Sequence, residues 1–473
     1  MVFSSSIFLL YFLPAFLLLY HLVPGKWKNY VILTASIAFY SWGAPKFLFV
    51  ILGSTIIDFY IVRQLYRSES KRARKSWLAL SLSLNLGLLA YFKYANFFVE
   101  NLNTALLEMG MGEVGWTKVL LPIGISFYTF QTLTYSIDIY RGIHAPLKKV
   151  TDYLLYIMSF PQMIAGPIVR YHLIAEQITN RKEHIDDKLT GFFRFAVGLG
   201  KKVLIANVMA EQADLIFEGD LSQLTTANAW LGILAYTFQI YFDFSGYSDM
   251  AIGLGKMIGF KLPENFDSPY VARSISEFWR RWHITLGAFM RDYLYIPLGG
   301  NRVKTRSRLF FNLWLVFLLS GLWHGASWNF VLWGAFHGAF LVLDRLFLRK
   351  LLQKAGAIPA TLFTFFTVMI GWVIFRIENL PEIPIYLGKL FAFDSTLPSD
   401  VQPGFPFILV FAVLFSFLPG LKWGDDIGKY LFRSKSFPLR VQYFWTLVAL
   451  VLVLLSVSSI LSSGFNPFIY YRF

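Results

Sequence analysis

Residues 441–461 read VQYFWTLVALVLVLLSVSSIL, a run that contains no charged side chain. An α-helix rises about 1.5 Å per residue, so a run of this length spans about 30 Å, the thickness of the hydrocarbon core of a bilayer. Similar, predominantly apolar runs lie at 5–23, 47–62, 76–96, 226–245 and 358–375. These runs predict an all-α, polytopic membrane protein.

The overall composition agrees with that prediction. Of the 473 residues, 56% are hydrophobic and only 15% are charged, whereas soluble proteins carry about 25% charged residues. A soluble core could not hide this much apolar surface, and large exposed apolar patches are rare on monomeric proteins.

The net charge of +15 could indicate a nucleic-acid partner, but its distribution favours a membrane. Basic loops at 62–75, 141–149 and 273–308 alternate with acidic or neutral loops at 97–117 and 211–225. This alternation is the positive-inside pattern, with the basic loops in the cytoplasm. We therefore expect the lipid bilayer as a partner and no nucleic acid.

The runs and the loop charges predict about 11 transmembrane helices, with the N-terminus outside. The run 5–23 begins within three serines, Ser4 to Ser6, and no Lys or Arg precedes it. This is a poor start for a signal peptide, so we expect the run to remain as a span. Because the sequence shows no internal repeat and no Gly/Ser linker, we expect one membrane domain over 1–473.

Two segments do not fit a simple series of spans. Residues 151–169 are apolar but lie between two basic loops and contain Pro161, Gly166 and Pro167, which break helices. We expect a re-entrant segment that lines an internal cavity. Residues 262–308 are basic, aromatic and too charged to span, and they predict interfacial helices at the cytoplasmic face.

Several kinds of chemistry are absent from the sequence. The chain has no cysteine, which excludes disulfides, thiolate metal sites and a thiol nucleophile. It has no Gly-x-Ser-x-Gly elbow and no His-Glu-x-x-His pair, so a hydrolase-type serine and a zinc site are unsupported and we expect no metal.

His324 is the first candidate for catalysis, since ionisable side chains inside membrane segments are costly and often functional. It lies in Ser320-Gly-Leu-Trp-His-Gly325, about 24 Å along a helix that starts at the basic loop before Arg308. Gly321 and Gly325 leave room for another backbone or for a substrate beside the imidazole. The residues alone fit a buried core histidine equally well.

The second candidate is the cluster Trp279, Arg280, Arg281, Trp282 and His283. It could be an aromatic belt with snorkelling arginines at the interface. It could instead be the mouth for an anionic, planar donor such as coenzyme A, with the arginines on phosphates and the indoles stacked on the base.

Other polar residues in apolar surroundings could line the same cavity. His337 lies in the middle of an apolar run, in Trp333-Gly-Ala-Phe-His-Gly338. Asp243, Ser245, Tyr247 and Asp249 lie in YFDFSGYSD at the end of the run 226–245. The two aspartates need partners at that depth, and a structural ion-pair lock is the plainer interpretation. The candidate cations are Arg273, Arg280, Arg281, Arg291 and Arg302.

With these segments in view, the chain resembles the membrane-bound O-acyltransferase family, and within it the bacterial proteins that O-acetylate alginate. The resemblance extends from the first residues to the closing aromatic tail. Its most specific blocks are LPIGISFY at 121–128, AGP at 165–167, the segment 241–253, FWRRWH at 278–283, DYLYIPLGGN at 292–301 and GLWHG at 321–325.

The resemblance implies a ring of helices around a central tunnel. It also implies that His324 is the essential histidine and that His283 is the second polar catalytic position. Trp279, Arg280, Arg281 and Trp282 would then bind the donor. Asp243, Ser245, Tyr247, Asp249, Trp323 and His337 would line the tunnel.

We therefore expect an O-acetyltransferase of the bacterial cytoplasmic (inner) membrane with no bound cofactor. Acetyl-coenzyme A would be the donor substrate at the cytoplasmic mouth, and neutral His324 would act as general base. A transient acyl-histidine is an open variant. The acceptor would be an extracytoplasmic polysaccharide, reached directly or through a periplasmic or extracellular acetyltransferase partner.

Two alternatives remain at this point. A transporter or flippase would also have many spans and a broken segment. A lipid acyltransferase of the same family would use a longer acyl donor.

Overall fold

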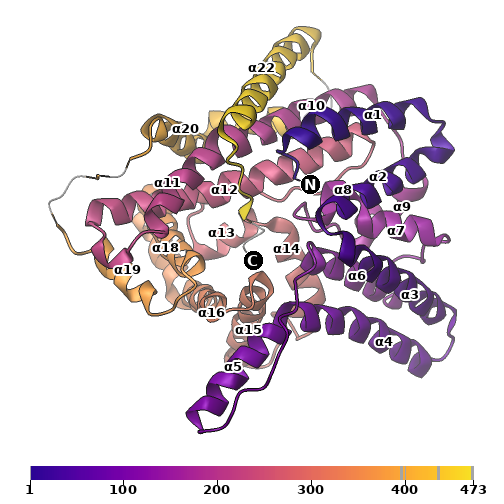
Figure 1. Cartoon of the computed structure of the whole chain (residues 1–473), viewed down its shortest axis with the longest axis horizontal. Helices are drawn as coiled ribbons and strands as arrows, with labels where there is room; N and C mark the ends of the chain where they lie inside the picture. Colours follow the sequence, from indigo (N-terminus) through magenta and orange to yellow (C-terminus); the bar gives the residue numbers. More distant parts are fainter. Residues whose placement is uncertain (1, 395–397, 400, 434–436, 470–473) are drawn as a thin grey trace. The chain divides into compact units, whose positions relative to one another are not determined.

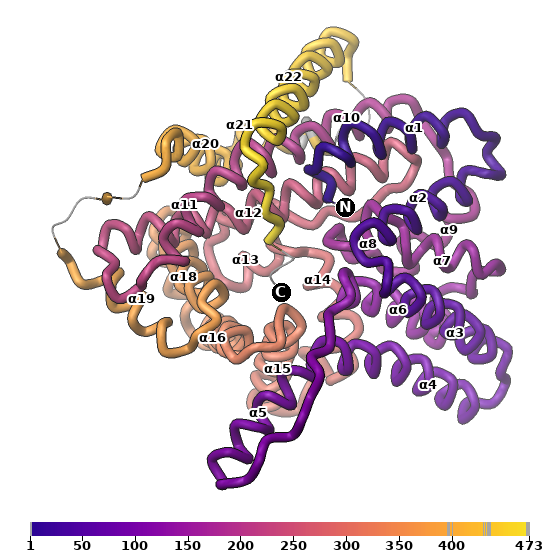
Figure 2. The backbone as a smooth tube through the Cα atoms, in the orientation of Figure 1, coloured from indigo at the N-terminus to yellow at the C-terminus, as the bar shows by residue number. Residues whose placement is uncertain are grey.

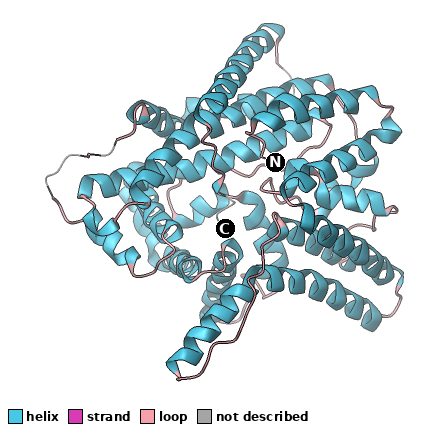
Figure 3. Cartoon of the chain, in the orientation of Figure 1, coloured by secondary structure: helices cyan, strands magenta, loops and turns pink. Residues whose placement is uncertain are grey.

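We analysed a computed structural model, which describes residues 2–394, 398–399, 401–433 and 437–469. The last residues of the closing aromatic tail, 470–473, lie outside the described residues. In the described part of the chain every regular element is helical (Figure 3). The all-α prediction is therefore confirmed.

Figure 1 shows the helices coloured along the chain. Their contacts divide them into two compact units. Unit 1 comprises residues 10–182 and 258–262, and unit 2 comprises residues 2–9, 183–257 and 263–473. All the site residues that we selected from the sequence lie in unit 2. The expectation of a single domain over 1–473 stays a prediction.

Unit 1 holds the N-terminal helices. Its helix α3 packs against α4, and α6 packs against both of them, while α7 lies against α2 and α3. The helices are α1 (Leu13–Leu22), α2 (Lys28–Gly43), α3 (Leu48–Arg67), α4 (Lys71–Leu89), α5 (Ala95–Glu108), α6 (Ile125–Tyr140), α7 (Val150–Met158), α8 (Phe160–Met163) and α9 (Tyr171–Thr179).

The segment 151–169 is broken as its prolines predict. Helix α7 ends at Met158, and after Ser159 the four-residue helix α8 begins at Phe160 with Pro161 in its first turn. A side chain on Gly166 would collide with the backbone of Pro161 and Gln162, so only glycine fits this turn. Nearly all of the segment is buried, as irregular backbone at membrane depth must be. Its re-entrant course stays a prediction.

Unit 2 is built around α12, with α10 and α11 along it and α18 and α19 also in contact (Figure 2). Its helices are α10 (Ile185–Gly200), α11 (Asn207–Phe217), α12 (Thr226–Met257), α13 (Ile275–Arg281), α14 (Ile284–Phe289), α15 (Arg306–His324), α16 (Trp328–Leu343), α17 (Arg349–Ala355), α18 (Ala357–Arg376), α19 (Glu382–Leu390), α20 (Phe405–Phe417), α21 (Lys422–Arg433) and α22 (Leu439–Ser463). A π-helical turn, η5 (Lys201–Ala206), joins α10 to α11.

Two glycine pairs bring α10 and α12 into close contact. A side chain on Gly191 would lie 2.6 Å from the carbonyl oxygen of Gly253, and one on Gly198 would lie 2.6 Å from that of Gly246. Small residues in such positions let membrane helices approach closely and gain van der Waals contact. This contact fixes the part of α12 that carries Asp243 to Asp249.

Five helical stretches among the described residues are long and apolar enough to cross a bilayer, or six if one bent pair at 405–428 forms a single span. They are Pro45–Arg67, Lys71–Glu108, Trp328–Ala355, Ala357–Arg376 and Leu439–Ser463. The chain is thus a multi-pass membrane protein, but the expected number of about 11 spans is not confirmed. The orientation of the N-terminus stays a prediction.

The segment 262–308 contains short helices instead of a span. Ser274 caps α13 by accepting a hydrogen bond from the Glu277 amide (3.1 Å). The buried Asp344 accepts another from the Ser276 amide (2.7 Å). Two side chains therefore fix the start of the helix that leads to His283.

Candidate active site

His324 is the last residue of α15, at the turn into α16. A side chain on Gly321 would collide with the carbonyl oxygen of Phe330, and one on Gly325 would collide with the Phe330 ring. The space that these glycines leave is thus taken up by α16. The glycines let α16 return directly beneath the imidazole, which is the close backbone approach that the sequence allowed.

The His324 side chain lies in an aromatic shell. Its ring centroid is 4.9 Å from that of Trp323, 5.2 Å from that of Trp333 and 5.3 Å from that of Phe375. The residue is only 7% exposed. That remaining exposure faces a small pocket with room for about one water molecule. The pocket is lined by Ile240, Phe244, Trp282, His324, Trp372, Phe375 and Ile469.

His283 lies between α13 and α14 in a left-handed backbone conformation, with φ 44° and ψ 53°. This conformation is uncommon for a residue other than glycine, and it clusters at functional sites. The Ile284 amide donates to the Asn265 carbonyl oxygen (2.9 Å), and the Gly287 amide donates to that of His283 (3.0 Å). These bonds hold the strained residue in place.

Asn265 fixes the tautomer of His283. The Thr285 amide lies 3.3 Å from Asn265 Oδ1, and because a backbone N–H can only donate, that atom is the amide oxygen. His283 Nδ1 lies 3.0 Å from the same oxygen and therefore carries the hydrogen. The lone pair of the ring is then on Nε2, which is buried and has no hydrogen-bond partner among the described residues.

His283 is only 1% exposed and lies outside the candidate spans. Burial lowers its pKa to about 3, so the imidazole is neutral at physiological pH. Its ring lies 4.7 Å from Phe244, a pocket residue, and 6.1 Å from Trp323, the neighbour of His324. The structure thus brings His283 and His324 to the same aromatic shell.

His337 belongs to a second layer of that shell. It is fully buried, with its ring 4.9 Å from Trp279 and 5.0 Å from Trp333. Neither ring nitrogen has a hydrogen-bond partner in the described part of the chain. A side chain on Gly371 would come 2.6 Å from His337 Nε2, so α18 also packs closely here.

The indoles of the expected donor site are packed inside the protein. Trp282 is 3% exposed, lines the His324 pocket and lies 4.9 Å from Trp372. Trp279 is partly buried against Trp333 and His337. Trp282 is therefore a wall of the pocket, and it is too buried to stack on a base at the surface.

The two arginines of this cluster differ. Arg280 is exposed. Arg281 is partly buried and forms an ion pair with Glu277 (2.9 Å), and it also donates to the backbone oxygen of Asp267 (3.0 Å). Arg280 is thus the more available of the two for an anionic group.

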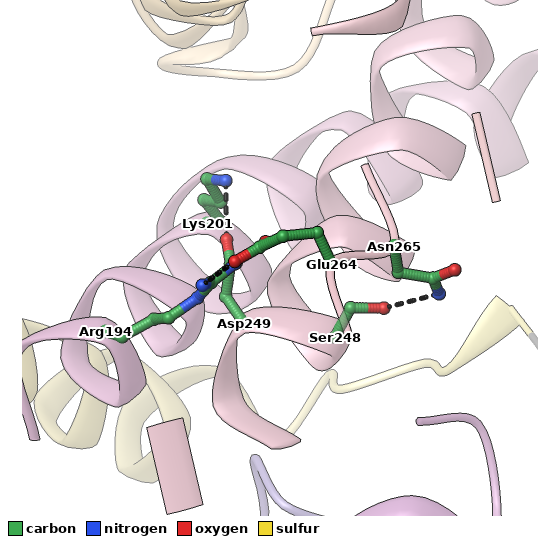
Figure 4. Close-up of polar contacts among 6 residues, drawn as sticks. All are labelled: Arg194, Lys201, Ser248, Asp249, Glu264 and Asn265. Carbon is green, nitrogen blue, oxygen red and sulfur yellow. Dashed lines mark hydrogen bonds and ion pairs between the residues drawn. The ribbon is translucent and has the colours of Figure 1, made fainter. Parts of the chain in front are cut away.

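The aspartates of α12 are paired, but the partners expected from the sequence are wrong. Asp249 accepts from Arg194 (2.8 Å) and from Lys201 (2.7 Å), and Arg194 also binds Glu264 (2.6 Å) (Figure 4). Asp243 pairs with Lys202 (2.8 Å). The cations come from α10 and η5 because the glycine contacts bring these segments against α12.

This ion-pair cluster is connected to His283. Ser248 directly precedes Asp249 on α12 and accepts from Asn265 Nδ2 (3.0 Å) (Figure 4). Asn265 Oδ1 in turn lies 3.0 Å from His283 Nδ1. Asp249 is thus the sequence neighbour of Ser248, which binds the asparagine that holds His283. The lock interpretation of the aspartates is therefore the one that their contacts support.

The other two tunnel candidates on α12 lie in different surroundings. Tyr247 is stacked between Phe3 (4.6 Å) and Phe468 (4.7 Å). Ser245 is buried and its hydroxyl has no partner among the described residues. Neither residue lines the His324 pocket.

Sequence reasoning missed several residues of the site, which are Arg194, Lys201, Lys202, Asn265, Trp372, Phe375 and Ile469. The three cations carried a usable signal, because they interrupt the apolar stretch GFFRFAVGLGKKVLIA at 191–206. Asn265 and Ile469 lie in irregular segments without a pattern, so only their contacts identify them.

Comparison with known proteins identifies the family. Residues 144–377, which include both His283 and His324, match the sequence profile of the membrane-bound O-acyltransferase family (MBOAT). A probable alginate O-acetylase of Pseudomonas putida is 43% identical over 100% of both chains. One from Azotobacter vinelandii is 45% identical over 85% of this chain and 80% of its own. A peptidoglycan O-acetyltransferase of Helicobacter pylori is 38% identical over 80% of this chain and 78% of its own.

These likenesses extend over most or all of the chain, at identities well above those of unrelated proteins. They decide against the transporter and flippase alternative. The chain belongs to the membrane-bound O-acyltransferase family and is an O-acyltransferase.

Proposed function

We propose that this O-acyltransferase moves an acetyl group from acetyl-coenzyme A, on the cytoplasmic side, to a hydroxyl of an extracytoplasmic polysaccharide, with His324 as general base. The observation that carries the proposal is the position of His324 on a small pocket with an otherwise apolar lining. The names of the relatives, alginate O-acetylase and peptidoglycan O-acetyltransferase, support an acetyl donor and a glycan acceptor.

The reaction needs one base and one leaving thiolate. A neutral imidazole nitrogen of His324 takes the proton of the acceptor hydroxyl while the oxygen bonds to the thioester carbonyl carbon. The C–S bond then breaks, the ester remains on the acceptor, and the coenzyme A thiolate takes up the proton. General-base assistance of this kind contributes about 10²- to 10⁴-fold to the rate.

The aromatic shell supports this chemistry by excluding water. Trp282, Trp372 and Phe375 leave room for little beyond the reacting group, which protects the thioester from hydrolysis. His283 serves as the second polar group, because Asn265 fixes the tautomer of its neutral ring and leaves the lone pair on Nε2. In this role it accepts a hydrogen bond from a neighbouring hydroxyl of the acceptor glycan, which turns the reacting hydroxyl toward His324 and the thioester.

The donor would enter from the cytoplasmic face, where 262–308 carries its positive charge. Arg280 is the exposed cation for the donor phosphates, and Arg281 assists from its pair with Glu277. Trp279 and Trp282 then act as walls between this surface and His324. The protein would lie in the bacterial cytoplasmic membrane with its N-terminus outside, so the acetyl group is delivered to a glycan or to an extracytoplasmic acetyltransferase.

The decisive experiment measures the release of coenzyme A thiol from acetyl-coenzyme A by the purified, detergent-solubilised protein with an oligosaccharide acceptor. We expect His324→Ala to lower the rate by about 10²- to 10⁴-fold with an unchanged melting temperature. His184→Ala is the matched control, since His184 is exposed at the start of α10. A folded His324→Ala protein with the wild-type rate would exclude the proposed base.

Two alternatives, an acyl-histidine intermediate and a long-chain acyl donor, can be tested with the same purified protein. Labelled protein after incubation without acceptor would indicate the acyl-histidine route instead of direct transfer. A preference for long-chain acyl donors would favour the lipid acyltransferase alternative over acetyl transfer.

A further inference from the structure

Residues 465–469, here called the strap, lie along the part of α12 that carries the polar candidates (Figure 2). Helix α22 ends at Ser463, and Gly464 (φ 63°) turns the chain back in the left-handed conformation that glycine favours. The strap has no regular structure over residues 464–468, so its position depends on contacts with the rest of unit 2.

A buried ion pair holds the strap by its backbone. Asp243 Oδ2 accepts a hydrogen bond from the Ile469 amide (2.9 Å), while Asp243 Oδ1 pairs with Lys202 (2.8 Å). Lys202 Nζ donates in turn to the carbonyl oxygen of Pro467. Both charged side chains are only 2% exposed, so the pair and the strap are desolvated together.

Two side chains of the strap add contacts to those of the Asp243–Lys202 ion pair. Phe468 stacks on Tyr247 with ring centroids 4.7 Å apart. Asn466 accepts from the Ser4 hydroxyl (3.0 Å) and donates to the Ser4 backbone oxygen (2.7 Å). The N-terminal residues and α12 therefore both fix the register of the strap.

This register places Ile469 in the pocket of His324, opposite residues of α12 and α18. We propose that the strap sets the size of the acyl group that the enzyme accepts, with Ile469 as the specificity-determining residue. The proposal rests on the proposed acyl transfer at His324. Asp243 and Lys202 are positioning residues, which act on the acyl group only through the strap.

The space around His324 supports a strict selection. The pocket holds about one water molecule, so each methylene added to the acyl group must displace more of its wall. A single methylene in an apolar pocket changes discrimination by about 10- to 200-fold. Ile469 reaches the pocket from the strap, whereas the pocket residues of α12, α15 and α18 belong to long regular helices.

The test compares kcat/KM for acetyl-, propionyl- and butyryl-coenzyme A in the full-length protein. We expect Ile469→Ala to raise the propionyl-to-acetyl ratio by about tenfold or more. Ile233→Ala is the matched control, because Ile233 lies on α12, is fully buried in the same apolar core and does not line the pocket. It should leave the ratio unchanged.

Asp243→Asn tests the positioning role, since it removes the charge opposite Lys202. We expect a smaller rise of the ratio, reversed in Asp243→Glu. A fall in all rates at a constant ratio would mean that the ion pair is structural only.

The failure of this inference can be told apart from that of the proposed function. If the wild-type protein consumes none of the three donors, the proposed donor class is wrong. If it consumes acetyl-coenzyme A and folded Ile469→Ala shows the wild-type ratio, the strap does not select the acyl group.

Discussion

The two units each bury a polar cluster, but they satisfy its atoms differently. In unit 1, Asp58 Oδ1 accepts from Ser81 (2.5 Å) and Asn85 (3.0 Å), and Oδ2 accepts from Tyr153 (2.6 Å). In unit 2, His283 Nδ1 is hydrogen-bonded, but its Nε2 has no partner among the described residues. Both ring nitrogens of His337 lack a partner in the same part of the chain.

We interpret the Asp58 cluster as structural and the two histidines as candidates for the reaction. A buried polar atom without a hydrogen bond costs free energy, and buried atoms of this kind are uncommon unless a ligand, water or reaction uses them. Asp58 joins α3, α4 and α7 with every carboxylate oxygen bonded. The histidines around the His324 pocket keep lone pairs available.

The largest predicted effect is the loss of stability when the Asp58 carboxylate of unit 1 is removed. Asp58→Ala leaves three buried donors without their partner and should lower the free energy of unfolding by about 3 to 5 kcal/mol. Thermal unfolding in detergent would measure it, with Asp58→Asn, which keeps one acceptor oxygen, as the milder control. An unchanged melting temperature would contradict a structural role for this cluster.

The second effect concerns activity instead of stability. His283→Ala should lower kcat/KM by about 100-fold, equivalent to about 2.7 kcal/mol, because the acceptor glycan loses the hydrogen bond that orients its reacting hydroxyl. Its melting temperature should fall less than that of Asp58→Ala, since Asn265 Oδ1 keeps its two Thr285 donors when the Nδ1 bond is lost, and Nε2 makes no bond in the described structure. The comparison between the clusters would break down if stability fell and the rate of the folded protein did not.

A smaller loss of stability is expected for Tyr153→Phe. This change removes one donor and leaves Asp58 Oδ2 without its hydrogen bond, at a cost of about 1 to 2 kcal/mol. Combined with Asp58→Ala, the second change should add little, because the two residues share one interaction. Full additivity in this double-mutant cycle would show that the hydroxyl contributes nothing through Asp58.

The smallest effect is the pH dependence of stability that His283 contributes. Its pKa of about 3 in the folded protein lies below the usual value near 6.5, so between these values the unfolded chain binds more protons. The stabilisation is complete above pH 6.5 and is lost as the pH falls toward 3. From pH 7 to 6 the loss should be about 0.7 kcal/mol.

The wild-type protein and His283→Gln should therefore differ in the pH dependence of their melting temperatures. Parallel curves for the two proteins between pH 7 and 5 would mean that the pKa of His283 is the same in the folded and unfolded states.

Much of the site could be predicted from local sequence because its residues lie in distinctive surroundings. A histidine between two glycines at the end of an apolar run identified His324, and a basic aromatic cluster identified His283. The partners of Asp243 and Asp249 could not be predicted, because Arg194, Lys201 and Lys202 lie about 40 to 55 residues away in sequence. Only the glycine contacts between α10 and α12 bring them together.

The sequence by itself determined the helical membrane class, because the bilayer requires long apolar helices and leaves a readable pattern of runs and loop charges. It also indicated the two histidines as candidates, through motifs that are local. Tertiary structure alone decided which side chains enclose His324, which nitrogen of His283 keeps its lone pair, and that Ile469 closes the pocket. Those properties depend on contacts between segments far apart in the chain, and no local pattern records them.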